Sequence, residues 1–170
     1  MPITANSPLP RITTLTLILC LFAVSCHDRY KHYRIDSNVM EPTLKVGRDV
    51  RVDREAYKHS LPVRWEVIVF KHPSNERTLS AMRVIGLPGE TVFINESGLM
   101  IDGARVQMPK ELQEIQYIPL RTRGTRFAVD SVFTIPANSY FVLGDNSGEA
   151  SDSRVWGALP LDRIVGKVER

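Results

Sequence analysis

Residues 83–103, RVIGLPGETVFINESGLMIDG, alternate short apolar runs with residues that form turns. Pro88-Gly89 predicts a tight turn, because glycine adopts the positive φ that several turn types require. Residues 91–94 and 99–101 are apolar runs joined by Asn-Glu-Ser-Gly, a pattern typical of a β-hairpin. This stretch therefore predicts antiparallel strands joined by short turns.

The rest of the chain carries more strand signals than helix signals. Residues 49–53 alternate with period two, as a half-buried strand does, and residues 66–70, EVIVF, are apolar enough for a fully buried strand. Further strands are expected at 131–135 and 140–143, and the only helix is expected at 109–116. Without crossover helices, the fold class is mainly β and antiparallel.

The composition of the 170 residues is that of an ordinary globular protein, with 43% hydrophobic and 24% charged residues and a net charge of +3. No run of Lys and Arg is long enough to indicate a nucleic-acid partner. Both cysteines, Cys20 and Cys26, precede the predicted domain, so the domain has no disulfide framework and no cysteine-based zinc site. We expect no cofactor and no metal, and we interpret residues 105–130 as a polar, irregular insertion.

Residues 12–24, ITTLTLILCLFAV, form an uncharged apolar run that follows Arg11 and precedes Ser25 and Cys26. The run is shorter than the roughly 20 residues that cross a bilayer squarely. Three interpretations are open: an uncleaved membrane anchor, a cleaved lipoprotein signal that leaves a lipid on Cys26, or a buried core helix. The first two place the domain at a membrane.

The chain is therefore divided into three parts. Residues 1–26 are the signal, anchor or lipoprotein segment, residues 27–34 are a juxtamembrane linker, and residues 35–170 are the β domain. The basic side chains of the linker are expected either to touch anionic headgroups or to be solvated.

Four stretches of the chain occur in the order found in one enzyme family: residues 34–57, 66–73, 83–103 and 140–157. On these stretches the chain resembles the type I signal peptidases, membrane-bound Ser/Lys endopeptidases that remove signal peptides. The resemblance implies the signal-peptidase fold, an extended, barrel-like antiparallel β structure behind an N-terminal hydrophobic segment. It also implies a membrane-facing substrate groove on the outer, extracytoplasmic side.

The family's chemistry uses a serine nucleophile, a lysine kept neutral by burial as general base, and a serine that orients the lysine. The resemblance places these roles at Val39, Met82 and Ala150. Val39 has no hydroxyl to attack a carbonyl, and the thioether of Met82 cannot serve as a general base. We therefore predict that no catalytic group of the family is intact at these positions.

Other positions do match the family. Ser37 corresponds to the serine that helps to bind the oxyanion. The remaining matches form the frame of the site: Met40, Pro42, Arg83, Gly144, Asp145, Asn146, Asp152, Ser153 and Arg154.

The sequence thus predicts a catalytically inactive homologue that binds extended, signal-peptide-like segments or associates with an active signal peptidase. One alternative is an active endopeptidase with a displaced catalytic pair, drawn from Ser37, Ser80, Ser151 and Lys71. Another is a structural lipoprotein that keeps the fold as a scaffold.

Overall fold

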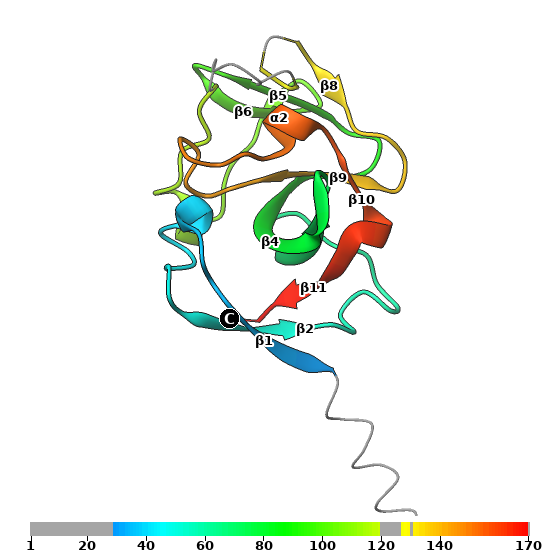
Figure 1. Cartoon of the computed structure of the whole chain (residues 1–170). Coiled ribbons are helices and arrows are strands. Elements are labelled where there is room, and N and C mark those ends of the chain that lie inside the picture. Colours follow the sequence, from blue (N-terminus) through cyan, green and yellow to red (C-terminus); the bar gives the residue numbers. More distant parts are fainter. Residues whose placement is uncertain (1–28, 120–126, 130, 170) are drawn as a thin grey trace, which may run out of the picture.

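The computed structural model describes residues 29–119, 127–129 and 131–169. Two antiparallel sheets make up this part of the chain, a seven-stranded sheet in the order β1-β2-β11-β3-β4-β9-β10 and a four-stranded sheet in the order β7-β6-β5-β8 (Figure 1). The large sheet contains β1 (Tyr30–Arg34), β2 (Asp49–Asp53), β3 (Val67–His72), β4 (Asn75–Gly86), β9 (Ser139–Leu143), β10 (Leu159–Pro160) and β11 (Ile164–Val168). The small sheet contains β5 (Thr91–Asn95), β6 (Gly98–Ile101), β7 (Ala104–Arg105) and β8 (Phe133–Thr134).

Helices are few and short in the described residues: η1 (Asn38–Met40), η2 (Lys110–Leu112), α2 (Ser153–Trp156) and η3 (Leu161–Arg163). The mainly β, antiparallel fold class predicted from the sequence is confirmed. No helix in the described ranges is long and apolar enough to cross a membrane. Residues 1–26, with the apolar run and Cys26, lie outside these ranges.

Three local predictions need correction. The helix expected at 109–116 is a single 3-10 turn, Lys110–Leu112, because no side chain caps its start and one turn does not propagate without support. The strand expected at 131–135 is only Phe133–Thr134. Part of the expected linker, Tyr30–Arg34, is strand β1, because its backbone pairs with β2 and Tyr33 packs against the core.

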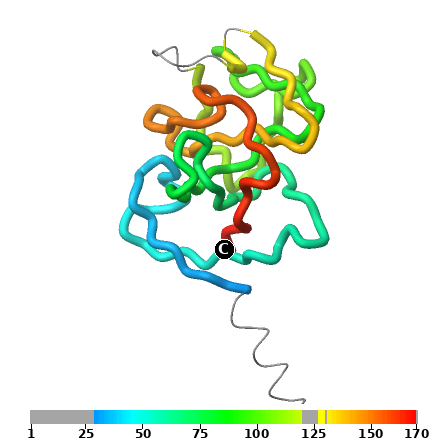
Figure 2. Tube along the Cα trace, turned by 45° about the vertical axis from the view of Figure 1, so that its right-hand side comes forward, coloured from blue at the N-terminus to red at the C-terminus, as the bar shows by residue number. Residues whose placement is uncertain are grey.

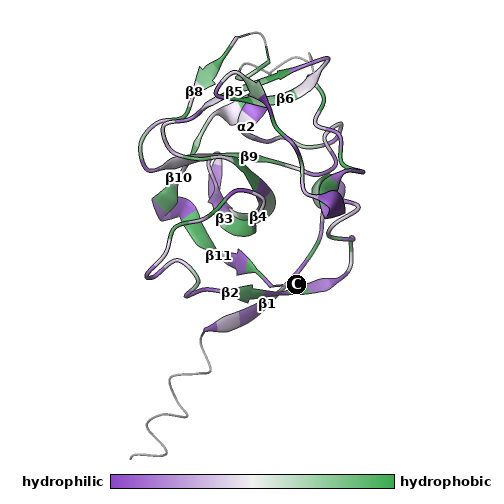
Figure 3. Cartoon of the chain, turned by 180° about the vertical axis from the view of Figure 1, so that it is seen from behind, coloured by the Kyte–Doolittle hydropathy of each residue, from purple (hydrophilic) through white to green (hydrophobic). Residues whose placement is uncertain are grey.

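Strands β4 and β9 lie between two hydrophobic clusters, and the side chains of successive residues pack alternately into one cluster and the other. Val84 and Val142 belong to the first cluster, whereas Ile85 and Phe141 belong to the second. Alternate side chains of a strand point to opposite faces, so a strand covered on both faces must be apolar throughout. Figure 3 shows the hydrophobic colour along β9 and the hydrophilic colour along much of β1.

The termini of the described chain meet at one end of the large sheet. Strand β11 pairs with β2, which pairs in turn with β1. In Figure 2 the red C-terminal strand runs down to the blue strand β1.

Candidate functional site

A groove of about 690 Å³ lies between the segment from Tyr33 to Met40 and the first half of β4. Strand β4 pairs with β3 along most of its length, but its pairing with β9 begins only at Arg83. Among the described residues, β1 likewise pairs with β2 alone. The groove is therefore flanked by two strand edges with unpaired main chain.

The floor of the groove is apolar at two of the positions that the sequence resemblance assigns to catalytic groups. Val39 and Met82 both line it, and both pack in the first hydrophobic cluster. Only 3% of the Met82 surface is exposed. Ser37 also lines the groove, as the N-cap of η1, and its Oγ accepts a long 3.4 Å hydrogen bond from the Val39 amide. A hydroxyl used as a cap stabilises the turn before Val39.

Ala150 lies beside the Val39 turn, with Gly144 between them. A Cβ built on Gly144 would stand 2.4 Å from Ala150 Cβ and 2.7 Å from the Val39 carbonyl oxygen. That same carbonyl accepts a 3.0 Å hydrogen bond from the Asn146 amide, and the Asn146 carbonyl accepts one from the Ala150 amide. Residues far apart in sequence, Val39 and Ala150, are thus held on one side of the site.

The frame residues Arg83 and Asp145 form a buried ion pair just behind Met82. Arg83 Nε donates to Asp145 Oδ1 at 2.8 Å, and both side chains have no solvent exposure. Thr43 Oγ1 donates to the same carboxylate and accepts from Arg83. Arg83 Nη1 donates to the carbonyl of Trp65, a residue with a positive φ of 76°. A buried charge is tolerated when it is paired in this way.

A second buried ion pair joins Asp152 and Arg154. Arg154 Nε and Nη2 donate to the two carboxylate oxygens at 2.9 and 2.7 Å. Asp152 also accepts from the Gly144 amide and caps α2 through the Arg154 amide. Ser153 Oγ accepts from the Val142 amide, which ties the helix to β9. These contacts hold the loop from Gly144 to Arg154 on the sheet.

Two further frame positions follow Val39. Met40 is 1% exposed and belongs to the first hydrophobic cluster. Pro42 is exposed and follows a cis peptide bond to Glu41. Ser37 caps the turn before Val39, and Met40 packs into the first hydrophobic cluster directly after it.

The residues considered as substitute catalytic groups are only partly brought together. Ser80 and Ser151 line the groove, and the Ser151 carbonyl accepts from Trp156 Nε1. Lys71 is exposed and is not part of the groove wall.

The sequence did not single out His72 as a groove residue. Its Nδ1 accepts a 3.2 Å hydrogen bond from the Ser74 amide, and its ring meets Trp156 edge-on at 5.9 Å. Partial burial lowers the pKa of His72 below its ordinary value. Burial thus favours the neutral imidazole, and in that form the Nδ1 that accepts from Ser74 leaves the proton on Nε2. No pattern in the sequence indicates this position, which lies at a register shift near the end of the β3–β4 hairpin.

Tyr117 is another site residue that lay inside the predicted irregular insertion. Its hydroxyl donates a 2.9 Å hydrogen bond to Asp145 Oδ1.

Within the parts of the chain that the structure describes, no cluster of three or more His, Cys, Asp or Glu residues could hold a metal ion.

The chain is similar to known signal peptidases over most of its length. The family model described as "Signal peptidase, peptidase S26" matches residues 10–170. Signal peptidase I of Pseudomonas aeruginosa is 31% identical over 79% of the chain, and that of Leptolyngbya laminosa is 36% identical over 78%. The chain spans 62% and 64% of the lengths of these two relatives.

A third relative and a solved structure to which the chain is similar are also described as signal peptidases. The probable signal peptidase I-1 of Synechocystis is 32% identical over 95% of the chain and 78% of its own length. The crystal structure of a signal peptidase I from Enterococcus faecalis matches with a TM-score of 0.50 and 31% identity, over 64% of this chain and 97% of that one. Because the family model matches almost the whole sequence, the chain belongs to the signal peptidase family, peptidase S26.

Proposed function

We propose that this protein is a non-catalytic signal peptidase homologue that binds extended peptide segments at the outer face of a membrane. The observation that carries the proposal is that Val39 and Met82, at the family's nucleophile and general-base positions, line one groove. An isopropyl group and a thioether offer neither a nucleophile nor a base. Ala150 also lacks a hydroxyl. None of the three side chains, Val39, Met82 and Ala150, therefore carries a polar group that would need a hydrogen-bond partner when buried.

The groove keeps what peptide binding requires. Edges of β1 and β4 offer main-chain donors and acceptors, so an extended peptide can pair as an added strand. The apolar floor, with Val39, Val69 and Met82, suits small or apolar side chains of such a peptide. Signal-peptide-like segments are the peptides that this family's members process, and we propose them as the ligands.

The membrane placement rests on residues 12–24 and on the lipid attachment that Cys26 offers. Mass spectrometry of the mature N-terminus separates an intact anchor from a lipidated Cys26. An unmodified chain that starts after residue 26 contradicts both.

The competing candidate is an endopeptidase with a displaced catalytic pair, and one observation favours it. His72 lines the same groove as Ser80 and Ser151, so an imidazole and two hydroxyls share one site. The hydrogen bond of His72 argues against it, because Nδ1 already accepts from the Ser74 amide and a neutral imidazole then has its proton on Nε2. A general base needs a free lone pair aimed at the hydroxyl.

Two assays on the full chain test the proposal. First, a signal-peptide substrate is incubated with the protein, and no turnover is expected. Cleavage that Ser37→Ala, Ser80→Ala or Ser151→Ala abolishes would establish the displaced pair instead. Second, binding of a labelled signal-peptide segment is measured by fluorescence anisotropy, and saturable binding is expected.

A matched pair of variants shows whether that binding uses the groove. Leu79 lines the groove and is 39% exposed, whereas Leu61 is 62% exposed in a loop that does not line it. Leu79→Glu is expected to weaken binding about tenfold, because it places a charge on the wall that receives apolar side chains. Leu61→Glu is expected to leave the affinity unchanged. Equal effects of both variants would mean that the peptide binds elsewhere.

A further inference from the structure

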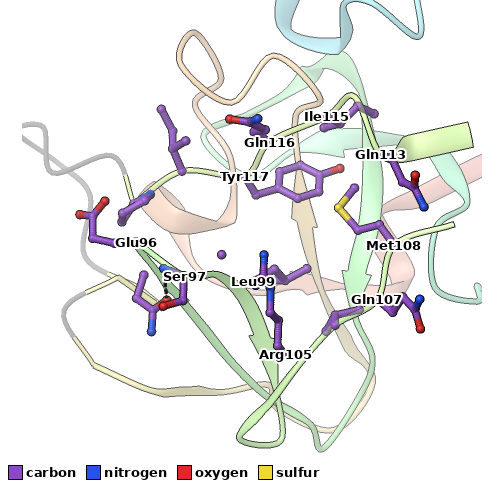
Figure 4. A pocket seen from close by; sticks show the side chains of 15 residues that line it. Glu96, Ser97, Leu99, Arg105, Gln107, Met108, Gln113, Ile115, Gln116 and Tyr117 are labelled. Carbon is purple, nitrogen blue, oxygen red and sulfur yellow. Dashed lines mark hydrogen bonds between the residues drawn. The ribbon is translucent and has the colours of Figure 1, made fainter. Parts of the chain in front are cut away.

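Tyr117 reaches from the second hydrophobic cluster to the frame of the groove. Its ring is 5% exposed and packs with the residues of the small sheet. In Figure 4 the ring lies between Ile115 and Leu99, and its hydroxyl points away from the hairpin residue Glu96. That hydroxyl donates to Asp145 Oδ1, which lies behind the groove floor. One side chain therefore joins the small sheet to the site.

The Asp145 carboxylate is held by donors from three directions. Arg83 comes from β4, Thr43 from the segment after η1, and Tyr117 from the small-sheet side. Burial, together with the charge of Asp145, raises the pKa of Tyr117 well above its ordinary value. The hydroxyl therefore remains a donor throughout the physiological range of pH.

The backbone directly after Asp145 makes the contacts that fix the groove wall. The Asn146 amide donates to the Val39 carbonyl at 3.0 Å, and Asn146 Nδ2 donates to the Asn38 carbonyl at 3.3 Å. Asn146 follows Asp145 directly in the chain, so a displacement of the Asp145 backbone also displaces the donors that hold η1 in place. Since Val39 lines the groove, the wall position depends on how firmly Asp145 is oriented.

The residue after Tyr117 reinforces the same connection. The Ile118 amide donates to Ser147 Oγ at 3.1 Å, and the Ile118 carbonyl accepts from Arg154 Nη1 at 2.9 Å. Ser147 and Arg154 belong to the loop that carries Asn146 and Ala150. Ile118 is therefore bonded to this loop through both its amide and its carbonyl.

We propose that Tyr117 is a positioning residue for the groove: through Asp145 it holds the Asn146 amide against the Val39 carbonyl and so sets the wall that a bound peptide meets. The part of this inference that concerns peptide affinity rests on the proposed function. The part that concerns the Asn146–Val39 contact does not.

The test compares Tyr117→Phe with Tyr140→Phe. Both tyrosines are buried, but the structure gives the Tyr140 hydroxyl no hydrogen bond among the described residues. Native-state hydrogen exchange of the Asn146 amide is measured at a temperature where both variants are folded. Tyr117→Phe is expected to speed this exchange about tenfold and to weaken peptide binding about fivefold, whereas Tyr140→Phe changes neither. The Val84 amide, which donates to the Glu66 carbonyl at 2.8 Å, serves as the internal reference.

Each outcome decides one point. Unchanged Asn146 exchange in folded Tyr117→Phe overturns the inference, as does equal acceleration at Asn146 and Val84, which would report a loss of global stability alone. If the wild type binds no peptide, the proposed function fails, and the exchange of Asn146 still decides the role of Tyr117.

A second measurement is available if Tyr117→Phe does not fold. With 3-fluorotyrosine at position 117, the ¹⁹F resonance is compared before and after Val39→Ala, because coupling between two sites is reciprocal. A shift at position 117 and none for the same probe at position 30, which belongs to neither hydrophobic cluster, supports the inference. No shift at position 117 contradicts it.

Discussion

Gly144 separates Val39 from Ala150 so closely that no side chain fits between them. A Cβ at Gly144 would lie 2.7 Å from the Val39 carbonyl oxygen and 2.4 Å from Ala150 Cβ. The position therefore requires glycine for lack of space, since backbone and a neighbouring Cβ cannot move aside easily. The close approach places the turn that carries Val39 directly on the loop that carries Ala150.

Gly144→Ala is expected to lower the free energy of unfolding by about 1 to 3 kcal/mol, because the added methyl overpacks this contact. Chemical denaturation measures the loss. Gly148 in the same loop is the matched control, since a Cβ there meets nothing within 4 Å. Gly148→Ala is expected to change stability by no more than about 0.5 kcal/mol. Equal losses would show that the loop, and not the close approach, determines the cost.

Asp152→Ala is expected to cost about 3 to 5 kcal/mol, because it leaves the guanidinium of Arg154 buried without its carboxylate. Asp152 is fully buried and Arg154 is 1% exposed. Asp49→Ala provides the comparison, since Asp49 and Arg34 are both largely exposed and 3.9 Å apart. A surface pair of this kind contributes about 0 to 1 kcal/mol. Thermal and denaturant unfolding of both variants check the contrast, and a small loss for Asp152→Ala would contradict the role given to this pair.

His72 is expected to make stability fall as the pH drops below neutral. Its folded-state pKa lies below the 6.5 of an unperturbed imidazole, so below that pH the unfolded chain binds more protons than the folded chain. The stability is complete above 6.5 and is lost as the pH falls through the folded-state pKa. An NMR titration should give a midpoint below 6.5, and His72→Gln should flatten the pH dependence. His59→Gln, in an exposed position, should leave it unchanged.

The triple variant Val39→Ser, Met82→Lys, Ala150→Ser is expected to gain measurable cleavage of a signal-peptide substrate. Because Met82 is 3% exposed, a lysine there has its pKa lowered by burial and is available as a base. Val39→Ser alone should show no turnover, since it lacks the base. A folded triple variant without turnover would mean that the groove no longer presents a peptide bond to position 39.

Much of the large sheet could be predicted from local patterns. Residues 49–53 and 66–70 carry period-two or continuous apolar patterns, and strands β2 and β3 form there. In the small sheet, the hairpin of β5 and β6 also forms around the turn predicted between these strands. These elements depend on neighbours along the chain, which a sequence displays directly.

Other parts of the structure depend on contacts between residues that are distant in the sequence, and no local sequence pattern indicates them. Tyr30–Arg34 becomes a strand only because β2 offers an edge to it. Tyr117 lies in a polar stretch, and its partner Asp145 is 28 residues away. The frame residues were predicted from the family resemblance and not from spacing, since Arg83 and Asp145 are 62 positions apart.

The open edges of β1 and β4 also bear on how the protein behaves at high concentration. A strand edge that accepts a peptide can equally accept the same edge of another copy, which is a route to aggregation. Lys31 and Arg34 on β1 and Arg77 on β4 are exposed along these edges. When two copies approach edge to edge, these side chains bring like charges together and oppose self-pairing. The basic residues are therefore expected to disfavour pairing between copies of the chain.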